Sequence, residues 1–190
     1  TLVECNKCGL VQLKDNPPLD TMYRQYWYRS GLNKSMVADL ADVVKEVERK
    51  VVLSPGDLVL DIGCNDGTLF KTYTQQGLIT VGYDPALNLY PECSLFFNNY
   101  LPDGAQLPKK AKDITAIAVF YDVPAPKEFI AGIKEHLADD GIWVIKFTDI
   151  CSMLKATAFD NICHEHLEYY SLRILVDLMA DQGLEVVDVD

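Results

Sequence analysis

The sequence lacks several features that would point to particular classes of protein. Basic side chains are scarce, since 17 lysines and arginines stand against 28 acidic residues and the formal net charge is −11. A phosphate-backbone partner demands a clustered basic face, and none is visible, so nucleic acid is not expected as a partner. No apolar run approaches the roughly 20 residues that span a bilayer, and no segment resembles a signal peptide. Neither membrane insertion nor secretion is therefore predicted.

Cysteines are few and scattered. Of the six, only Cys5 and Cys8 lie close together, which argues against a secreted disulfide framework and favours a cytoplasmic, reducing compartment. The C-x-x-C spacing suits zinc, but a structural zinc site takes four ligands, and one pair supplies half of them. We therefore expect Cys5 and Cys8 to form a half site that is empty here unless another chain completes the tetrahedron.

The chain has enough apolar residues to bury a sizeable core. Its 190 residues are 49% hydrophobic, which suits one α/β domain with a small appendage. Apolar positions recur every three or four residues over 32–51 and predict a helix of about five turns. Further helices are predicted over 68–76, 126–137 and 171–182, and strands over 58–62, 80–83, 95–97, 114–120, 142–147 and 184–189. Apolar strands alternating with helices predict a mostly parallel sheet covered on both faces.

A glycine loop follows the first of these strands. The pattern Asp61-x-Gly63-x-x-x-Gly67 gives a tight turn with bare backbone, which a ligand can approach closely. A second carboxylate, Asp84, ends the next strand and can accept hydrogen bonds from both hydroxyls of a ribose. A dinucleotide site would carry a glycine where Asn65 stands, so the loop favours a nucleoside with an amino-acid tail, such as S-adenosylmethionine (SAM). The alternative is an ordinary strand-to-helix turn whose glycines serve packing alone.

Several motifs in consistent order resemble the sugar C-methyltransferase family, which acts on nucleotide-linked 4-keto-deoxysugars. The His-Glu-His segment with its flanks is the most specific of them, and the resemblance covers nearly the whole chain. The motifs are Cys5-x-x-Cys8, Tyr26-x-Tyr28-x-Ser30-Gly31, the loop from Leu60 to Leu69, and Phe159-Asp160-x-Ile162-x-His164-Glu165-His166-x-x-Tyr169-x-Ser171.

The resemblance implies a class I methyltransferase fold, which is a Rossmann-like, doubly wound, mostly parallel sheet. It implies that residues 1–13 are the remnant of a zinc-binding module, that 14–53 form a linker and a lid helix, and that 54–190 form the SAM-binding domain. The last sheet strand and the C-terminal domain of the family would lie outside the chain, and zinc would belong to the full-length parent only.

Methylation of carbon needs a base that removes a proton beside a ketone, and a donor that stabilises the enolate oxygen. By the resemblance His166 is that base, with Glu165 beside it. In an extended loop His164 would point the same way as His166. Tyr28 is expected to hydrogen-bond the sugar. Where the family commonly has a tyrosine this chain has Cys163, which removes a phenolic donor.

The remaining expected contacts are to the cofactor. Besides the loop and Asp84, we expect Pro85, Tyr26, Ser30 and Tyr121 on the cofactor side, and within the loop Asp61, Gly63, Cys64, Asn65, Asp66 and Gly67. The predicted function is SAM-dependent C-methylation of a nucleotide-linked keto sugar. The alternatives are O- or N-methylation of another small molecule, a non-catalytic SAM-binding fragment and, weakest, a zinc module that binds nucleic acid.

Overall fold

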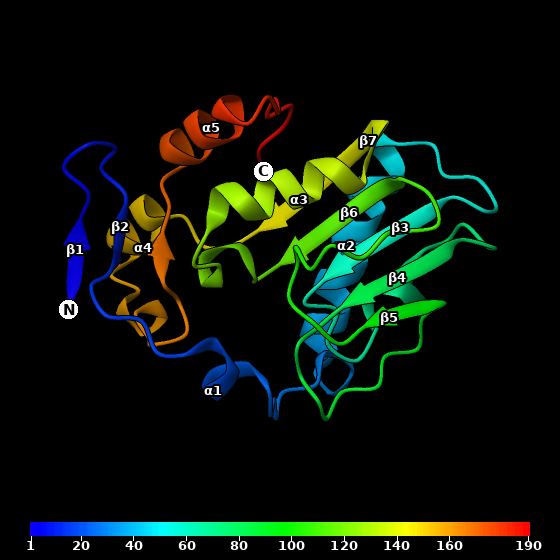
Figure 1. Ribbon diagram of the computed structural model, residues 1–190, viewed down its shortest axis with the longest axis horizontal. Coiled ribbons are helices and arrows are strands. Elements are labelled where there is room, and N and C mark those ends of the chain that lie inside the picture. The colour runs from blue at the N-terminus through cyan, green and yellow to red at the C-terminus, as the bar shows by residue number, and fades with distance from the viewer.

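The computed structural model describes residues 1–190, and its centre is a five-stranded parallel sheet in the order β5-β4-β3-β6-β7 (Figure 1). The strands of this sheet are β3 (Leu58–Ile62), β4 (Ile79–Tyr83), β5 (Leu95–Phe97), β6 (Ala111–Ile117) and β7 (Leu137–Lys146). The chain runs outward from β3 to β5 and then returns to the other side of β3. This reversal puts the topological switch point between β3 and β6, where ligands of open α/β sheets bind.

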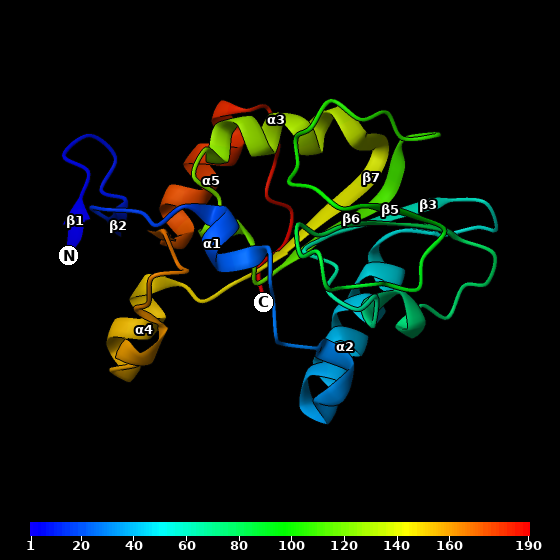
Figure 2. The same ribbon diagram turned by 60° about the horizontal axis from the view of Figure 1, so that its bottom comes forward.

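Helices cover both faces of the sheet, as the apolar strands predict. Figures 1 and 2 show α2 on one face and α3 and α5 on the other. Side chains alternate along β3, so Leu58, Leu60 and Ile62 belong to one core and Val59 to the other. The helices are α1 (Leu19–Tyr23), α2 (Lys34–Lys50), α3 (Pro126–His136), α4 (Ile150–Ala156) and α5 (Leu172–Asp181).

A second, antiparallel sheet lies beside the first. It contains an N-terminal hairpin, β1 (Leu2–Glu4) with β2 (Val11–Leu13), and a third strand, β8 (Glu168–Tyr169). The sequence did not predict β8, which pairs Val11 with Tyr169. The hairpin therefore anchors the segment that directly follows the His-Glu-His motif.

Two predicted elements differ in the structure. Instead of a helix over 68–76 there is a short 3₁₀ turn, Leu69–Thr72, because Glu48 of α2 accepts hydrogen bonds from the backbone of Thr74 and Gln75 and holds that stretch away from helical geometry. Residues 184–189 form no strand, since Leu184 N donates to Met179 O as the end of α5 and the segment pairs with neither sheet.

The other predicted elements are present within a few residues. Asn33 caps α2, because its side chain accepts from the backbone N–H of Ser35, and Ser171 caps α5 in the same way through Ile174. None of the helices combines the length and the apolarity that crossing a membrane requires.

Candidate functional site

A cavity of about 390 Å³ opens at the carboxyl ends of β3, β4 and β6, beside the switch point. Its floor comes from the loops that follow these strands. Its other wall comes from residues 19–40, the segment that leads from α1 into α2. The size is in the range of small-molecule and cofactor sites. Of the residues expected at the site, the lining includes Asp61, Gly63, Cys64, Asn65, Asp84, Pro85, Tyr26, Tyr28 and Ser30.

The first glycine of the loop is required by its surroundings. Gly63 has φ +72°, and a Cβ at this position would lie 2.4 Å from Cγ2 of Val119, in the loop after β6. Neither the backbone conformation nor the space admits a side chain. The bare backbone of the loop therefore borders the cavity, as a close-approaching ligand needs.

Asp84 is fixed at the end of β4, facing the glycine loop. It is only 6% exposed, its Oδ2 accepts from the backbone N–H of Asn65 at 3.0 Å, and its Oδ1 accepts from that of Ala86 at 2.9 Å. Burial raises the pKa of Asp84, and the two backbone hydrogen bonds lower it in part. Each carboxylate oxygen keeps a second lone pair that can accept from a ligand hydroxyl.

Asn65 ties the N-terminal segment over the loop. Its Oδ1 accepts from the backbone N–H of Ser30 at 3.0 Å, and its Nδ2 donates to the carbonyl of Tyr28 at 3.2 Å. The backbone N–H of Gly31 donates to Asp66 at 2.9 Å. An amide thus stands where a dinucleotide site would have a bare glycine, and it holds Tyr28 and Ser30 at the cavity. Asp66 and Gly67 themselves lie outside the lining.

Asp61 lines the cavity and connects two neighbouring strands of the sheet beneath the glycine loop. Its side chain is buried, and its Oδ1 accepts from the hydroxyl of Thr115 on β6 at 2.6 Å. Burial raises the pKa of Asp61 to about 7, against the lowering effect of Thr115. This contact links β3 to β6 under the glycine loop and so braces the switch point.

The His-Glu-His segment lies beside the cavity rather than in its lining. His166 borders a separate small hollow, where its Nδ1 is 2.8 Å from the carbonyl of Asn161 and its ring packs on Tyr121 with centroids 4.2 Å apart. His164 is exposed. The backbone oxygen of Glu165 accepts from the hydroxyl of Tyr23 at 3.2 Å, which connects the segment to α1.

The sequence interpretation did not single out two residues that line the cavity close to that segment, Tyr23 and Asp122. Asp122 ends a 3₁₀ turn, Phe120–Asp122, after β6, and its Oδ1 is shielded from solvent without a hydrogen-bond partner. Burial raises the pKa of Asp122 to about 8. An acidic residue just past a strand at the switch point was the available signal in the sequence.

The cysteine pair lies in the β1–β2 turn, far along the chain from these loops. The backbone N–H of Gly9 donates to the carbonyl of Cys5 at 2.8 Å and closes the turn between the two cysteines. No group of three or more His, Cys, Asp or Glu side chains is arranged to hold a metal ion.

Residues 32–189, which contain the glycine loop, Asp84 and Asp122, match a family described as a methyltransferase domain. The chain belongs to this family. The C-methyltransferase NovU of Streptomyces niveus is similar, with 29% identity over 197 residues that cover 99% of this chain and 47% of the relative. The chain thus spans about half the length of that curated relative. The expected kinship with C-methyltransferases is confirmed.

Solved structures agree on the fold. A putative methyltransferase in complex with the Haloferax volcanii activator Trm112 has a TM-score of 0.65 at 18% identity, covering 84% of this chain and 75% of the other. Magnesium protoporphyrin IX methyltransferase from Synechocystis PCC 6803, with bound SAM, has a TM-score of 0.58 at 18% identity, covering 81% and 71%. The expected class I, Rossmann-like methyltransferase fold is confirmed.

Proposed function

We propose that the cavity binds SAM and that the chain is the methyl-transferring part of a SAM-dependent methyltransferase. The observation that carries the proposal is the pairing of a bare glycine loop with a buried carboxylate, Asp84, across one cavity. Asp84 would accept from the ribose hydroxyls, and the backbone from Gly63 to Asn65 would border the methionine part. When bound, SAM supplies an electrophilic methyl group on a sulfonium, whose sulfur keeps the bonding electron pair as the methyl leaves.

We propose further that the methyl acceptor is the carbon beside the ketone of a nucleotide-linked 4-keto-deoxysugar. The relation to a C-methyltransferase supports an acceptor carbon. Tyr26 and Tyr28 line the cavity and can donate to an enolate oxygen in place of the tyrosine replaced by Cys163. Burial raises the pKa of Tyr26 to about 12, so its phenol stays protonated and remains a donor at neutral pH.

The cavity lining also limits how such a substrate would lie. It contains no lysine, arginine or histidine, whereas Asp61, Asp84, Asp122 and Glu128 line it. A diphosphate would meet no cation there and would be repelled by the carboxylates. The neutral keto-sugar ring would therefore enter the cavity, with the diphosphate outside it.

Two groups are available as the base. The family resemblance favours His166, whose Nδ1–H can donate to the carbonyl of Asn161 and leave Nε2 as the proton acceptor. Within this proposal Glu165 and His164 flank that base. The alternative is Asp122, which lines the cavity.

The proposed function is tested by calorimetric titration of the chain with SAM and, separately, with NAD. Binding of SAM alone is expected. Binding of NAD instead, or of neither, would contradict the proposal. The acceptor is tested by following solvent deuterium entering dTDP-4-keto-6-deoxy-D-glucose at the carbon beside its ketone. Absence of exchange by a chain that binds SAM would count against the keto sugar and leave the cofactor assignment standing.

A further inference from the structure

The turn that follows β6 borders both the cavity and the small hollow beside His166. This 3₁₀ turn is Phe120–Asp122, and the cavity is lined by Val119 before it and by Asp122 at its end. Tyr121, between these two, is outside the lining of the cavity and lines the hollow together with His166. A side chain expected on the cofactor side therefore packs beside the base that the family resemblance implies.

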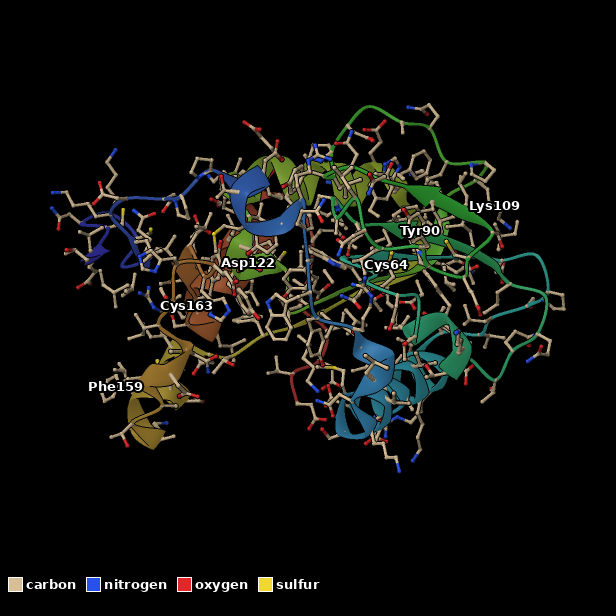
Figure 3. The ribbon with its side chains drawn as sticks, turned by 90° about the horizontal axis from the view of Figure 1, so that it is seen from below. Cys64, Tyr90, Lys109, Asp122, Phe159 and Cys163 are labelled. Carbon is tan, nitrogen blue, oxygen red and sulfur yellow. The ribbon has the colours of Figure 1, made fainter.

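Tyr121 contacts the segment before β8 at two points. Its ring packs on the imidazole of His166, with centroids 4.2 Å apart and planes inclined by 50°. Its backbone carbonyl accepts from the N–H of Leu167 at 2.9 Å. Figure 3 shows the two segments together, with Asp122 of the turn close to Cys163. The histidine is thus held against the turn through both its own ring and the backbone of the next residue.

The hydrophobic core keeps this turn in place. Phe120 is fully buried, and its ring packs on Phe129 of α3 and on Trp143 of β7. On the cavity side, Val119 lies so close to Gly63 that a side chain at the glycine would clash with it. The packed core therefore fixes the turn, and with it the separation between the glycine loop and the hollow.

We propose that Tyr121 is a positioning residue that orients the imidazole of His166 for removal of the proton from the acceptor carbon. This inference rests on the proposed function, with His166 as the base. In that step the C–H bond beside the ketone breaks, the proton bonds to Nε2 of His166, and the electron pair moves onto the ketone oxygen. Tyr121 acts on this step only through the histidine.

The ring of Tyr121 and the carbonyl of Asn161 fix different properties of the imidazole. An aromatic ring packed on the imidazole restricts its rotation. The carbonyl of Asn161, 2.8 Å from Nδ1, accepts the Nδ1–H and leaves Nε2 as the proton acceptor. Without the ring of Tyr121 the imidazole can turn away from Asn161, and it then loses both its orientation and its single tautomer.

The first test follows deuterium exchange at the carbon beside the ketone of dTDP-4-keto-6-deoxy-D-glucose. Tyr121→Leu removes the ring but keeps an apolar side chain, and it should lower the exchange rate at saturating sugar at least about tenfold, because the base is misoriented. The half-saturating sugar concentration and the SAM affinity should change by less than about twofold. Tyr121→Phe keeps the ring and should exchange as the unchanged chain does.

The matched control is Tyr90→Leu, the same substitution at a tyrosine that is 85% exposed. Its exchange rate should equal that of the unchanged chain. Undiminished exchange in Tyr121→Leu would overturn the inference. So would a loss of SAM affinity that parallels the loss of exchange, because the ring would then support the whole site rather than the base.

The second test needs no sugar. Nitrogen-15 spectra at about pH 8.5, where a histidine side chain is ordinarily neutral, show which ring nitrogen carries the proton. His166 should be in the Nδ1–H form in the unchanged chain and in Tyr121→Phe, and in a mixture of both tautomers in Tyr121→Leu. His136 and His164 are internal controls and should not differ among the three chains.

The two tests distinguish this inference from the proposed function. If the unchanged chain binds SAM but exchanges no deuterium into the sugar, while Tyr121→Leu changes the tautomer of His166, the sugar assignment fails and the positioning of His166 by Tyr121 stands. If the unchanged chain exchanges deuterium but His166 has the same tautomer in all three chains, the proposed function stands and the inference is overturned.

Discussion

At the scale of single residues, Asp84 is the side chain on which cofactor binding should depend most. It is held by two backbone N–H groups and faces the glycine loop across the cavity. Asp84→Ala should weaken SAM binding by about 1–3 kcal/mol, because the ribose hydroxyls and the two backbone donors lose their acceptor. Titration calorimetry measures the change.

The control for this prediction is Asp140→Ala, which removes an exposed carboxylate from the surface, where it pairs with Lys112. Its SAM affinity should match that of the unchanged chain. Equal affinity of Asp84→Ala and the unchanged chain would mean that the ribose lies elsewhere.

Substitution of Gly63 tests whether the glycine loop must lack a side chain at this position. Gly63→Ala should destabilise the fold by about 1–2 kcal/mol from its left-handed backbone alone, with a further cost from the clash with Val119. Gly104 has a similar φ of +76°, but a methyl group added there would have nothing within 4 Å, so Gly104→Ala carries only the backbone cost. Urea unfolding of both variants isolates the effect of packing, and equal losses would contradict the close approach of Val119.

At the scale of elements, the segment from α1 to α2 is held over the glycine loop by a few hydrogen bonds. Asn65 supplies two of them, to the backbone of Ser30 and Tyr28, and its own φ is +51°. Asn65→Gly tolerates that φ but removes both bonds, so amide hydrogen exchange over residues 26–31 should quicken while exchange in β3 stays slow.

The matched variant is Asn65→Asp, which keeps the acceptor for the Ser30 N–H and loses only the donor to Tyr28. It should lie between the unchanged chain and Asn65→Gly. Identical exchange in all three chains would show that other contacts hold the segment.

Element boundaries depended on contacts that sequence patterns do not contain. The apolar period predicted α2, and the helix predicted from Ser171 is α5, which that residue caps. The helix predicted over 68–76 is replaced by a 3₁₀ turn, because Glu48, more than twenty residues earlier in the chain, binds the backbone there. A side chain from another element can thus outweigh local helix propensity.

At the scale of the whole molecule, stability should fall as pH rises from about 4 to about 8 and then level off. Burial raises the pKa of Asp61, Asp113 and Glu168 to about 7 and that of Asp122 to about 8. At pH values between the unfolded pKa of each group and its raised folded pKa, the folded state binds more protons than the unfolded state does. Unfolding therefore becomes easier as pH increases through this range.

The fall should be steepest between about pH 5 and pH 7, where each group contributes up to about 1.4 kcal/mol per pH unit until it ionises in the folded state. Urea unfolding across this range measures it. Asp122→Asn should flatten the curve between about pH 7 and pH 8 and raise stability above it, whereas Glu128→Gln should leave the shape unchanged. A flat curve in the unchanged chain would contradict the raised pKa values.

The sequence by itself determined the parallel sheet, the glycine loop with Asp84, and the kinship with C-methyltransferases. These features are local, since apolar periods, turn glycines and the ends of strands depend on residues that are close together in the sequence. It also predicted Tyr26, Tyr28 and Ser30 at the site, because they belong to one short motif, and all three line the cavity.

Only the tertiary structure decided that Asp122 lines the cavity and that His166 does not. His166 and Asp122 lie 44 positions apart in the chain, and β8 pairing with the hairpin sets the first while the end of β6 sets the second. Likewise, the groups that shift the pKa of Asp122, the Tyr23 hydroxyl and the Glu165 carboxyl, come from α1 and from the segment before β8. Burial and pairing depend on contacts between distant segments, and no local pattern encodes them.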